Sequence, residues 1–108
     1  MASLGTIILK GASGTEYKFY IYAKDTTFKK FGAVYAITRK EDDSLTHNII
    51  YIGQTGDTSE RFDNHHRIGC FNKYKWNRIC IHSDDNEKSR LKKESDLIEK
   101  YNPDCNKQ

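Results

Sequence analysis

AVYAIT at residues 33–38 and IIYIG at residues 49–53 are two runs of apolar, β-branched and aromatic residues. Such runs are typical of buried strands, and the charged, turn-forming residues 40–48 between them are typical of a hairpin loop. We therefore predict that the runs pair as neighbouring strands. Tyr35 and Tyr51 occupy odd positions in the two runs, so both can lie on one face of the sheet. Packing on the core is the commoner role of such aromatics.

A second hairpin is predicted near the N-terminus. Residues 6–9 and 17–22 are β-branched or aromatic, and the turn-forming residues 11–14 lie between them. This N-terminal hairpin, residues 1–24, carries no obvious chemistry. We expect it to extend the sheet or to form a surface for DNA or a protein partner.

Two helices and a further strand are predicted downstream. Asp57 stands three residues before Glu60, which favours a helix from there to about His66, ended or interrupted by Gly69. A short helical or irregular piece then runs through Lys75. A strand at residues 77–81 and a final helix of roughly 15 residues follow. The helix starts within residues 83–86, and Pro103 prevents it from passing Tyr101 or Asn102.

Length and charge limit the possible classes of protein. A chain of 108 residues suits one compact domain with a single modest core. The net charge of +3 permits a polyanionic partner without requiring one. No run approaches the ~18 apolar residues of a membrane span, and no export signal is visible, so we expect no membrane partner. The three cysteines are odd in number and widely spaced, which makes a disulfide framework unexpected and a reducing cytoplasm the default location.

Glu94 is the most unusual residue of the final helix. On a helical wheel at ~100° per residue, the apolar stripe is marked by Leu91, Leu97, Ile98 and Tyr101. Glu94 falls in the middle of that stripe, where an unpaired charge would cost several kcal/mol. It therefore needs a cation. The alternatives are a core ion pair, for example with Arg61, and a Mg²⁺-type ion held through one carboxylate.

Arg61 and His65 are four residues apart, so they project from one face of the first predicted helix. The planar guanidinium of Arg61 suits a phosphate, and the imidazole of His65 can transfer a proton near neutral pH. A solvated helix face would explain the same pair.

Residues 61–78 form the best candidate for a nucleic-acid surface. Basic side chains can neutralise phosphates while interleaved aromatics stack on bases or join the core. The candidate binding residues are Arg67, Lys73, Lys75 and Arg78, with Phe71, Tyr74 and Trp76 between them. A structural zinc site is a weaker alternative, because its candidate ligands lack the usual spacing; they are His65, His66, Cys70, Cys80 and His82.

In the order of these residues the chain resembles the GIY-YIG nuclease superfamily over roughly residues 32–106. The namesake tripeptides correspond to Ala33-Val34-Tyr35 and Tyr51-Ile52-Gly53. The segment from Glu94 to Pro103, Asp104, Cys105 and Asn106 resembles the metal-binding Glu and the Pro-x-x-Asn ending of the family. Gln54 stands where many members carry Lys.

The resemblance implies an α+β fold, in which a small antiparallel sheet flanked by helices forms the nuclease core at residues 32–108. It also implies one divalent metal, Mg²⁺ with Mn²⁺ as a substitute, and hydrolysis of a DNA phosphodiester. Glu94 would hold the metal, Arg61 would bind the phosphate and Tyr35 would be the base or a relay to it. Tyr51 and His65 would position the water, and Asn106 would be a structural or site-bordering amide.

The sequence leaves other functions open. A non-catalytic DNA-binding module with this fold is one alternative, motivated by Gln54, and a protein-interaction domain that uses the N-terminal hairpin is another. RNA in place of DNA, and a homodimer in place of a monomer, are also compatible with the sequence.

Overall fold

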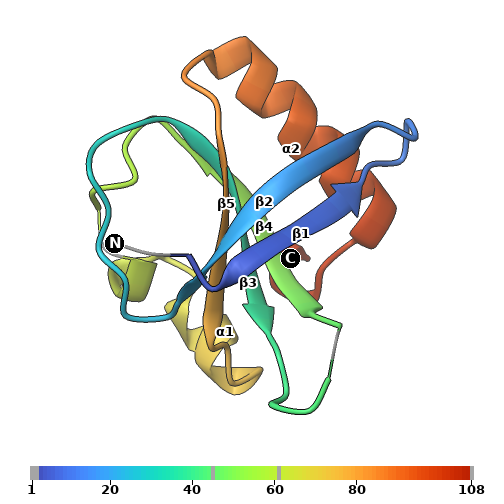
Figure 1. The fold of residues 1–108 in the computed structure, drawn as a ribbon. Helices are drawn as coiled ribbons and strands as arrows, with labels where there is room; N and C mark the ends of the chain where they lie inside the picture. Colours follow the sequence, from blue (N-terminus) through green and yellow to red (C-terminus); the bar gives the residue numbers. More distant parts are fainter. Residues whose placement is uncertain (1–2, 45, 61, 108) are drawn as a thin grey trace.

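A five-stranded antiparallel sheet forms the centre of the molecule (Figure 1). The structure is a computed structural model that describes residues 3–44, 46–60 and 62–107. The strands are β1 (Gly5–Lys10), β2 (Glu16–Ala23), β3 (Ala33–Arg39), β4 (Asn48–Thr55) and β5 (Arg78–Ser83), in the order β1-β2-β5-β3-β4. The helical elements are the 3₁₀ turns η1 (Phe62–Asn64) and η2 (Asp104–Asn106) and the helices α1 (Ile68–Lys73) and α2 (Glu87–Tyr101). The predicted α+β class and both predicted hairpins are confirmed.

Helices cover both faces of the sheet. Side chains alternate along a strand, so Tyr35 of β3 belongs to one apolar cluster and Val34 to the other. Phe71 of α1 is buried in the first cluster and Leu97 of α2 in the second. We call these two sides the α1 face and the α2 face.

The N-terminal hairpin is part of the same sheet. β2 pairs with β5 in an antiparallel register. Leu9, Phe19 and Ile21 of the hairpin are buried in the α2-face cluster together with Leu97. The expectation that this segment extends the sheet is therefore confirmed.

The helix predicted from Asp57 to about His66 is wrong. Asp57 Oδ1 accepts a 2.8 Å hydrogen bond from the Ser59 backbone N–H, and Thr58 bonds through its N–H and hydroxyl to the 29–31 segment. These contacts use the polar groups in a turn, which competes with a helix. The described residues 57–60 are not helical, η1 is the first helical element of the described chain, and Gly69 lies inside α1 instead of ending it.

The final helix matches its prediction in length and ends. Asn86 caps its N-terminus by accepting from the Ser89 N–H, and Asn102 ends it in a left-handed conformation just before Pro103. The predicted apolar stripe is wrong at one position, because Leu91 is 46% exposed. Arg90, one residue earlier, is buried instead.

The expectation of unpaired cysteines is also wrong. Cys70 of α1 and Cys105 of η2 form a disulfide, with their Cα atoms 5.8 Å apart, and Cys80 is free and buried. The two cysteines meet because the chain after α2 turns along β4 and reaches the α1 face. The cysteine content therefore gives no support for a reducing compartment.

Among the helices that the structure describes, none has the length and apolarity to span a membrane.

Candidate active site

Three predicted site residues meet on the α1 face. The Oη of Tyr35 lies 2.8 Å from Nε2 of His65, and the Tyr51 ring lies 6.1 Å from the Tyr35 ring and 5.0 Å from the His65 ring. The register of β3 and β4 explains the tyrosine pair, because Tyr35 is opposite Gly53 and Ile37 is opposite Tyr51. The predicted shared face of the two tyrosines is confirmed.

Gly53 makes room for the tyrosine pair. A Cβ atom at this position would lie 2.6 Å from Cζ and Oη of Tyr35 and 2.8 Å from a ring carbon of Tyr51. No side chain fits in that space without displacing a ring. The glycine is therefore explained by close approach of the two rings, not by a turn.

The hydrogen bonds of His65 determine where its proton lies. Nδ1 accepts a 3.0 Å hydrogen bond from the Arg67 backbone N–H, so the neutral ring carries its proton on Nε2 and donates it to Oη of Tyr35. Burial, followed by the charges of His66 and Arg67, lowers the pKa of His65 to about 4. At neutral pH, His65 is thus a neutral hydrogen-bond donor to the phenol oxygen of Tyr35.

Both tyrosines are difficult to ionise in the protein alone. Burial, then the neighbouring Tyr51 and Glu94, raises the pKa of Tyr35 well above its usual value. Burial and then Glu94 raise the pKa of Tyr51 as well. Neutralising the Glu94 carboxylate would remove one cause of both shifts.

Glu94 lies half-buried beside β4. Burial raises its pKa, and a hydrogen bond from the Gln54 backbone lowers it in part. No basic side chain in residues 3–44, 46–60 and 62–107 forms an ion pair with it. Arg61, the partner suggested by the core ion-pair alternative, lies outside the described residues, as does its predicted role in binding phosphate. His65 itself lies between η1 and α1 and not on the predicted helix.

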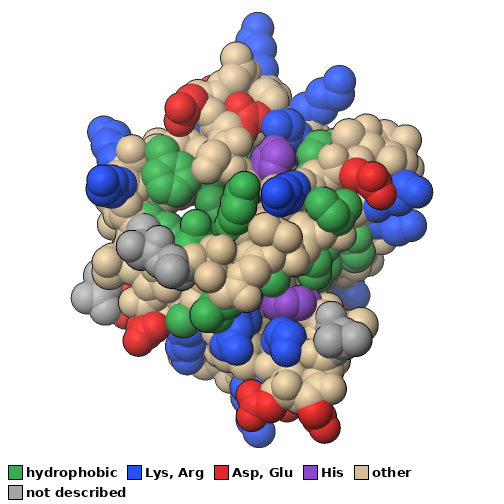
Figure 2. Space-filling model, viewed as in Figure 1, with side chains coloured by type: hydrophobic (Ala, Val, Ile, Leu, Met, Phe, Trp, Pro, Cys, Tyr) green, Lys and Arg blue, Asp and Glu red, His purple; other side chains and the backbone are tan. Residues whose placement is uncertain are grey.

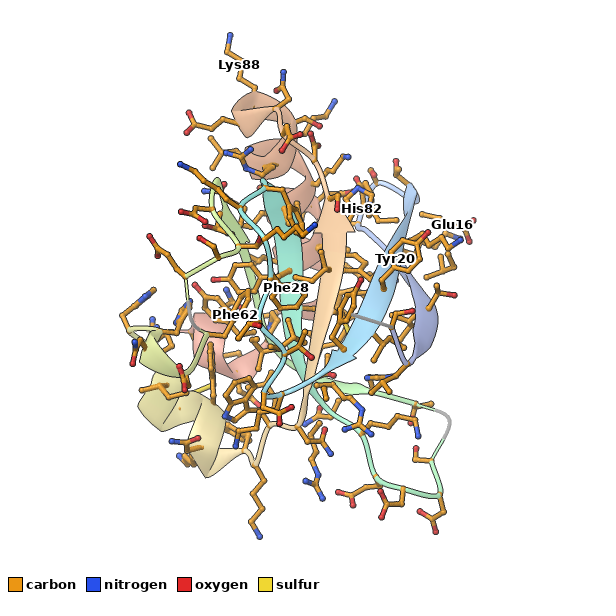
Figure 3. All side chains as sticks on the ribbon, turned by 60° about the vertical axis from the view of Figure 1, so that its left-hand side comes forward. Glu16, Tyr20, Phe28, Phe62, His82 and Lys88 are labelled. Atoms are coloured by element: carbon orange, nitrogen blue, oxygen red, sulfur yellow. A yellow bond between two sulfur atoms is a disulfide. The ribbon has the colours of Figure 1, made fainter. Side chains whose placement is uncertain are left out.

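A cleft of about 650 Å³ opens beside Tyr35. Tyr35, His65 and Phe62 line one part of it, and the 54–60 segment lines the other. The Phe62 ring packs edge-on against Tyr35 at 4.9 Å. It also packs edge-on against Phe28 at 5.9 Å (Figure 3). The cleft thus has an aromatic wall and a polar wall that includes Gln54, Asp57 and Glu60.

A family model for the GIY-YIG catalytic domain matches residues 31–108. The chain belongs to the GIY-YIG nuclease superfamily. No match to a curated protein or to a solved structure meets the significance threshold. The matched range starts just before β3 and contains all the site residues above, whereas the β1–β2 hairpin lies outside it.

Asn106 lies at the end of the GIY-YIG domain and contacts β4. Its Oδ1 accepts from the Ile52 N–H and its Nδ2 donates to the Ile52 carbonyl, both at 2.8 Å. Of the two placements predicted for this amide, the contacts support the structural one.

The predicted nucleic-acid residues of the GIY-YIG domain differ in their exposure. Lys73 and Lys75 are exposed at the end of α1, whereas Arg67 and Arg78 are half-buried. Phe71 and Trp76 are core residues and cannot stack on bases. On the face shown in Figure 2, Lys and Arg side chains are scattered and do not form one continuous patch.

The zinc alternative does not fit this GIY-YIG domain. In the part of the chain that the structure describes, no three His, Cys, Asp or Glu side chains gather closely enough to hold a metal ion. Cys70 is in the disulfide, and Cys80 lies in the cluster of the opposite, α2 face.

Sequence reasoning missed Arg90, which touches the lining of the GIY-YIG cleft through Gln54. Its Nε donates a 3.0 Å hydrogen bond to Oε1 of Gln54. Arg90 stands four residues before Glu94, so the helical wheel that located Glu94 also places it near the buried side.

Proposed function

We propose that this GIY-YIG domain is a Mg²⁺-dependent endonuclease that hydrolyses DNA phosphodiester bonds. The observation that supports this most is the Glu94 carboxylate, which is half-buried, lacks a basic partner among the described residues and is near enough to Tyr35 and Tyr51 for its charge to raise the pKa of both. A carboxylate in that position needs a cation.

Glu94 suits Mg²⁺ better than a metal that requires several protein ligands. Mg²⁺ commonly binds through one or two carboxylates together with waters and substrate phosphate, and the described residues offer no cluster of three ligands. When bound, such an ion polarises a phosphoryl oxygen and makes its bound water a stronger acid. Mn²⁺ prefers the same oxygen ligands and is the expected substitute.

Tyr35 and His65 would handle the proton of the attacking water. The His65 Nε2–H donates to Oη of Tyr35, and a donor at this oxygen favours the phenolate form that can accept a proton. Tyr51, in ring contact with both, would help to position the water. Arg61 would bind the phosphate, as its residue type predicts.

Cleavage of supercoiled plasmid, linear duplex, branched DNA and single-stranded RNA tests the proposal. Parent protein should cut at least one DNA in Mg²⁺ or Mn²⁺, and Glu94→Gln should bind that DNA without cutting it. Glu99→Gln is a matched control, because Glu99 is exposed on the same helix. Binding without cutting by the parent protein in every metal would instead support the non-catalytic DNA-binding module. Equal cutting by Glu94→Gln would reject the proposed role of Glu94.

A further inference from the structure

Arg90 is a buried cation with no obvious structural need for its charge. Its side chain is 5% exposed, and no carboxylate in the described part of the chain pairs with it. Its Nε donates a hydrogen bond to Oε1 of Gln54, at 3.0 Å, and its Nη1 donates to the Asp84 carbonyl, at 3.1 Å. A buried charge without a counter-ion is costly, so an apolar residue would serve packing better.

The chain is shaped around the guanidinium. A Cβ atom at Gly32 would lie 2.5 Å from Nη1 of Arg90, and one at Gly56 would lie 3.4 Å from Nη2. Together with its two hydrogen bonds, this packing holds the guanidinium in one orientation. The Arg90 guanidinium is therefore a hydrogen-bond donor held in a fixed position against the Gln54 side chain.

The chemistry of Arg90 fixes the orientation of the Gln54 amide. Arginine has only donors, so the Gln54 atom that meets Nε must be the oxygen. The amide NH₂ group is then directed away from Arg90 and has no acceptor among the described groups. Gln54 lines the cleft together with Tyr35, and its backbone donates to Glu94.

We propose that Arg90 is a positioning residue that orients the Gln54 amide so that its NH₂ group binds a non-bridging oxygen of a phosphodiester in the cleft. This inference rests on the proposed function. Asp57 and Glu60 also line the cleft and would repel a phosphate, so a fixed donor beside Glu94 has a clear use there. The Gln54 amide supplies this hydrogen-bond donor without adding a charged group to the cleft.

Gln54→Glu separates this role from a structural one. The carboxylate keeps an acceptor for Arg90 and adds an ion pair, but it removes the NH₂ donor. We expect the unfolding midpoint to stay the same or to rise, while the affinity for a short DNA duplex, measured by anisotropy in EDTA, falls at least ~tenfold. Because the added carboxylate would itself repel DNA, Gln54→Met, which removes the NH₂ donor without adding a charge, is tested beside it and should bind at least ~tenfold more weakly as well. If Gln54 serves only to satisfy Arg90, the folded Gln54→Met would bind the duplex as the parent does, and the inference would be wrong.

A double-mutant cycle tests Arg90 itself. Arg90→Lys keeps the charge but loses the fixed fork, so it should weaken duplex binding in the parent and leave it unchanged in the Gln54→Ala background. Equal weakening in both backgrounds would show a merely structural Arg90. Because binding is measured without metal, a parent that binds but never cuts would defeat the proposed function while this inference is still decided. A parent that binds no duplex would overturn the inference.

Discussion

The side-chain amide of Asn106 pairs with the backbone of Ile52 through two hydrogen bonds of 2.8 Å. β4 is an edge strand of the sheet, so the outward N–H and C=O of Ile52 have no neighbouring strand. Asn106 therefore takes the place of a residue in the missing strand. An open strand edge invites pairing with other chains, and this contact blocks part of it.

Asn106→Asp should destabilise the protein by about 1–3 kcal/mol. The aspartate keeps an acceptor for the Ile52 N–H but brings an oxygen to the Ile52 carbonyl, which loses its donor. Urea unfolding at neutral pH measures the change. Asn48→Asp, on an exposed residue at the start of β4, is the control. Equal stability of the two variants would contradict a structural role for Asn106.

Gly53→Ala should lower stability by about 1–3 kcal/mol and displace both tyrosines, because the new methyl group overlaps Tyr35 and Tyr51. Thermal unfolding and near-ultraviolet circular dichroism report the two effects. Gly69→Ala is the matched substitution, since nothing lies within 4 Å of a Cβ there and the residue is inside α1. That variant should be neutral or slightly stabilised. Comparable losses in both variants would argue against the close approach at Gly53.

Thiol counting tests the disulfide. With Cys70 and Cys105 paired and Cys80 buried, the native protein should show no reactive thiol, and the denatured, unreduced protein should show one per chain. Reduction should lower the free energy of unfolding by roughly 2–4 kcal/mol, because the bond closes a long loop in the unfolded chain. Three thiols in denaturant without reductant would show that the pair does not form.

The stability of the protein should depend on pH through His65. Its pKa is about 4 in the folded protein against an ordinary value of 6.5, so between these values the unfolded chain binds a proton that the native state does not. The free energy of unfolding should therefore fall as the pH is lowered through this window.

Urea titrations of the parent and His65→Gln at about pH 7 and about pH 4.5 isolate this effect, because the carboxyl groups contribute to both proteins. The parent should lose more stability than the variant on acidification. An equal loss of stability in the two proteins would show that folding does not lower the pKa of His65.

Local patterns predicted the strands and α2, because alternation, the Asn86 cap and Pro103 act over a few neighbouring residues. The same local pattern failed at Asp57, because an aspartate that can cap a helix can equally close a turn. Tertiary contacts decided between the two, through the bonds of Thr58 to the 29–31 segment.

The candidate site was predicted where residue type and strand register suffice, as for Tyr35 and Tyr51. The Cys70–Cys105 pair depends on the path of the chain after α2, which no spacing reveals. Arg90 was missed although the helical wheel places it near Glu94, because the long arginine side chain usually carries its charge out to solvent. The predicted role of Arg61 stays a prediction.

The position of β5 between β2 and β3 has a consequence for protein engineering. The family match begins at residue 31, yet a protein shortened to that point would leave β5 as a bare edge and strip Leu97 and Cys80 of their apolar cover. The segment that the family model matches therefore depends on the β1–β2 hairpin for its packing. A graft of this chain's nuclease segment onto another protein must therefore include the β1–β2 hairpin.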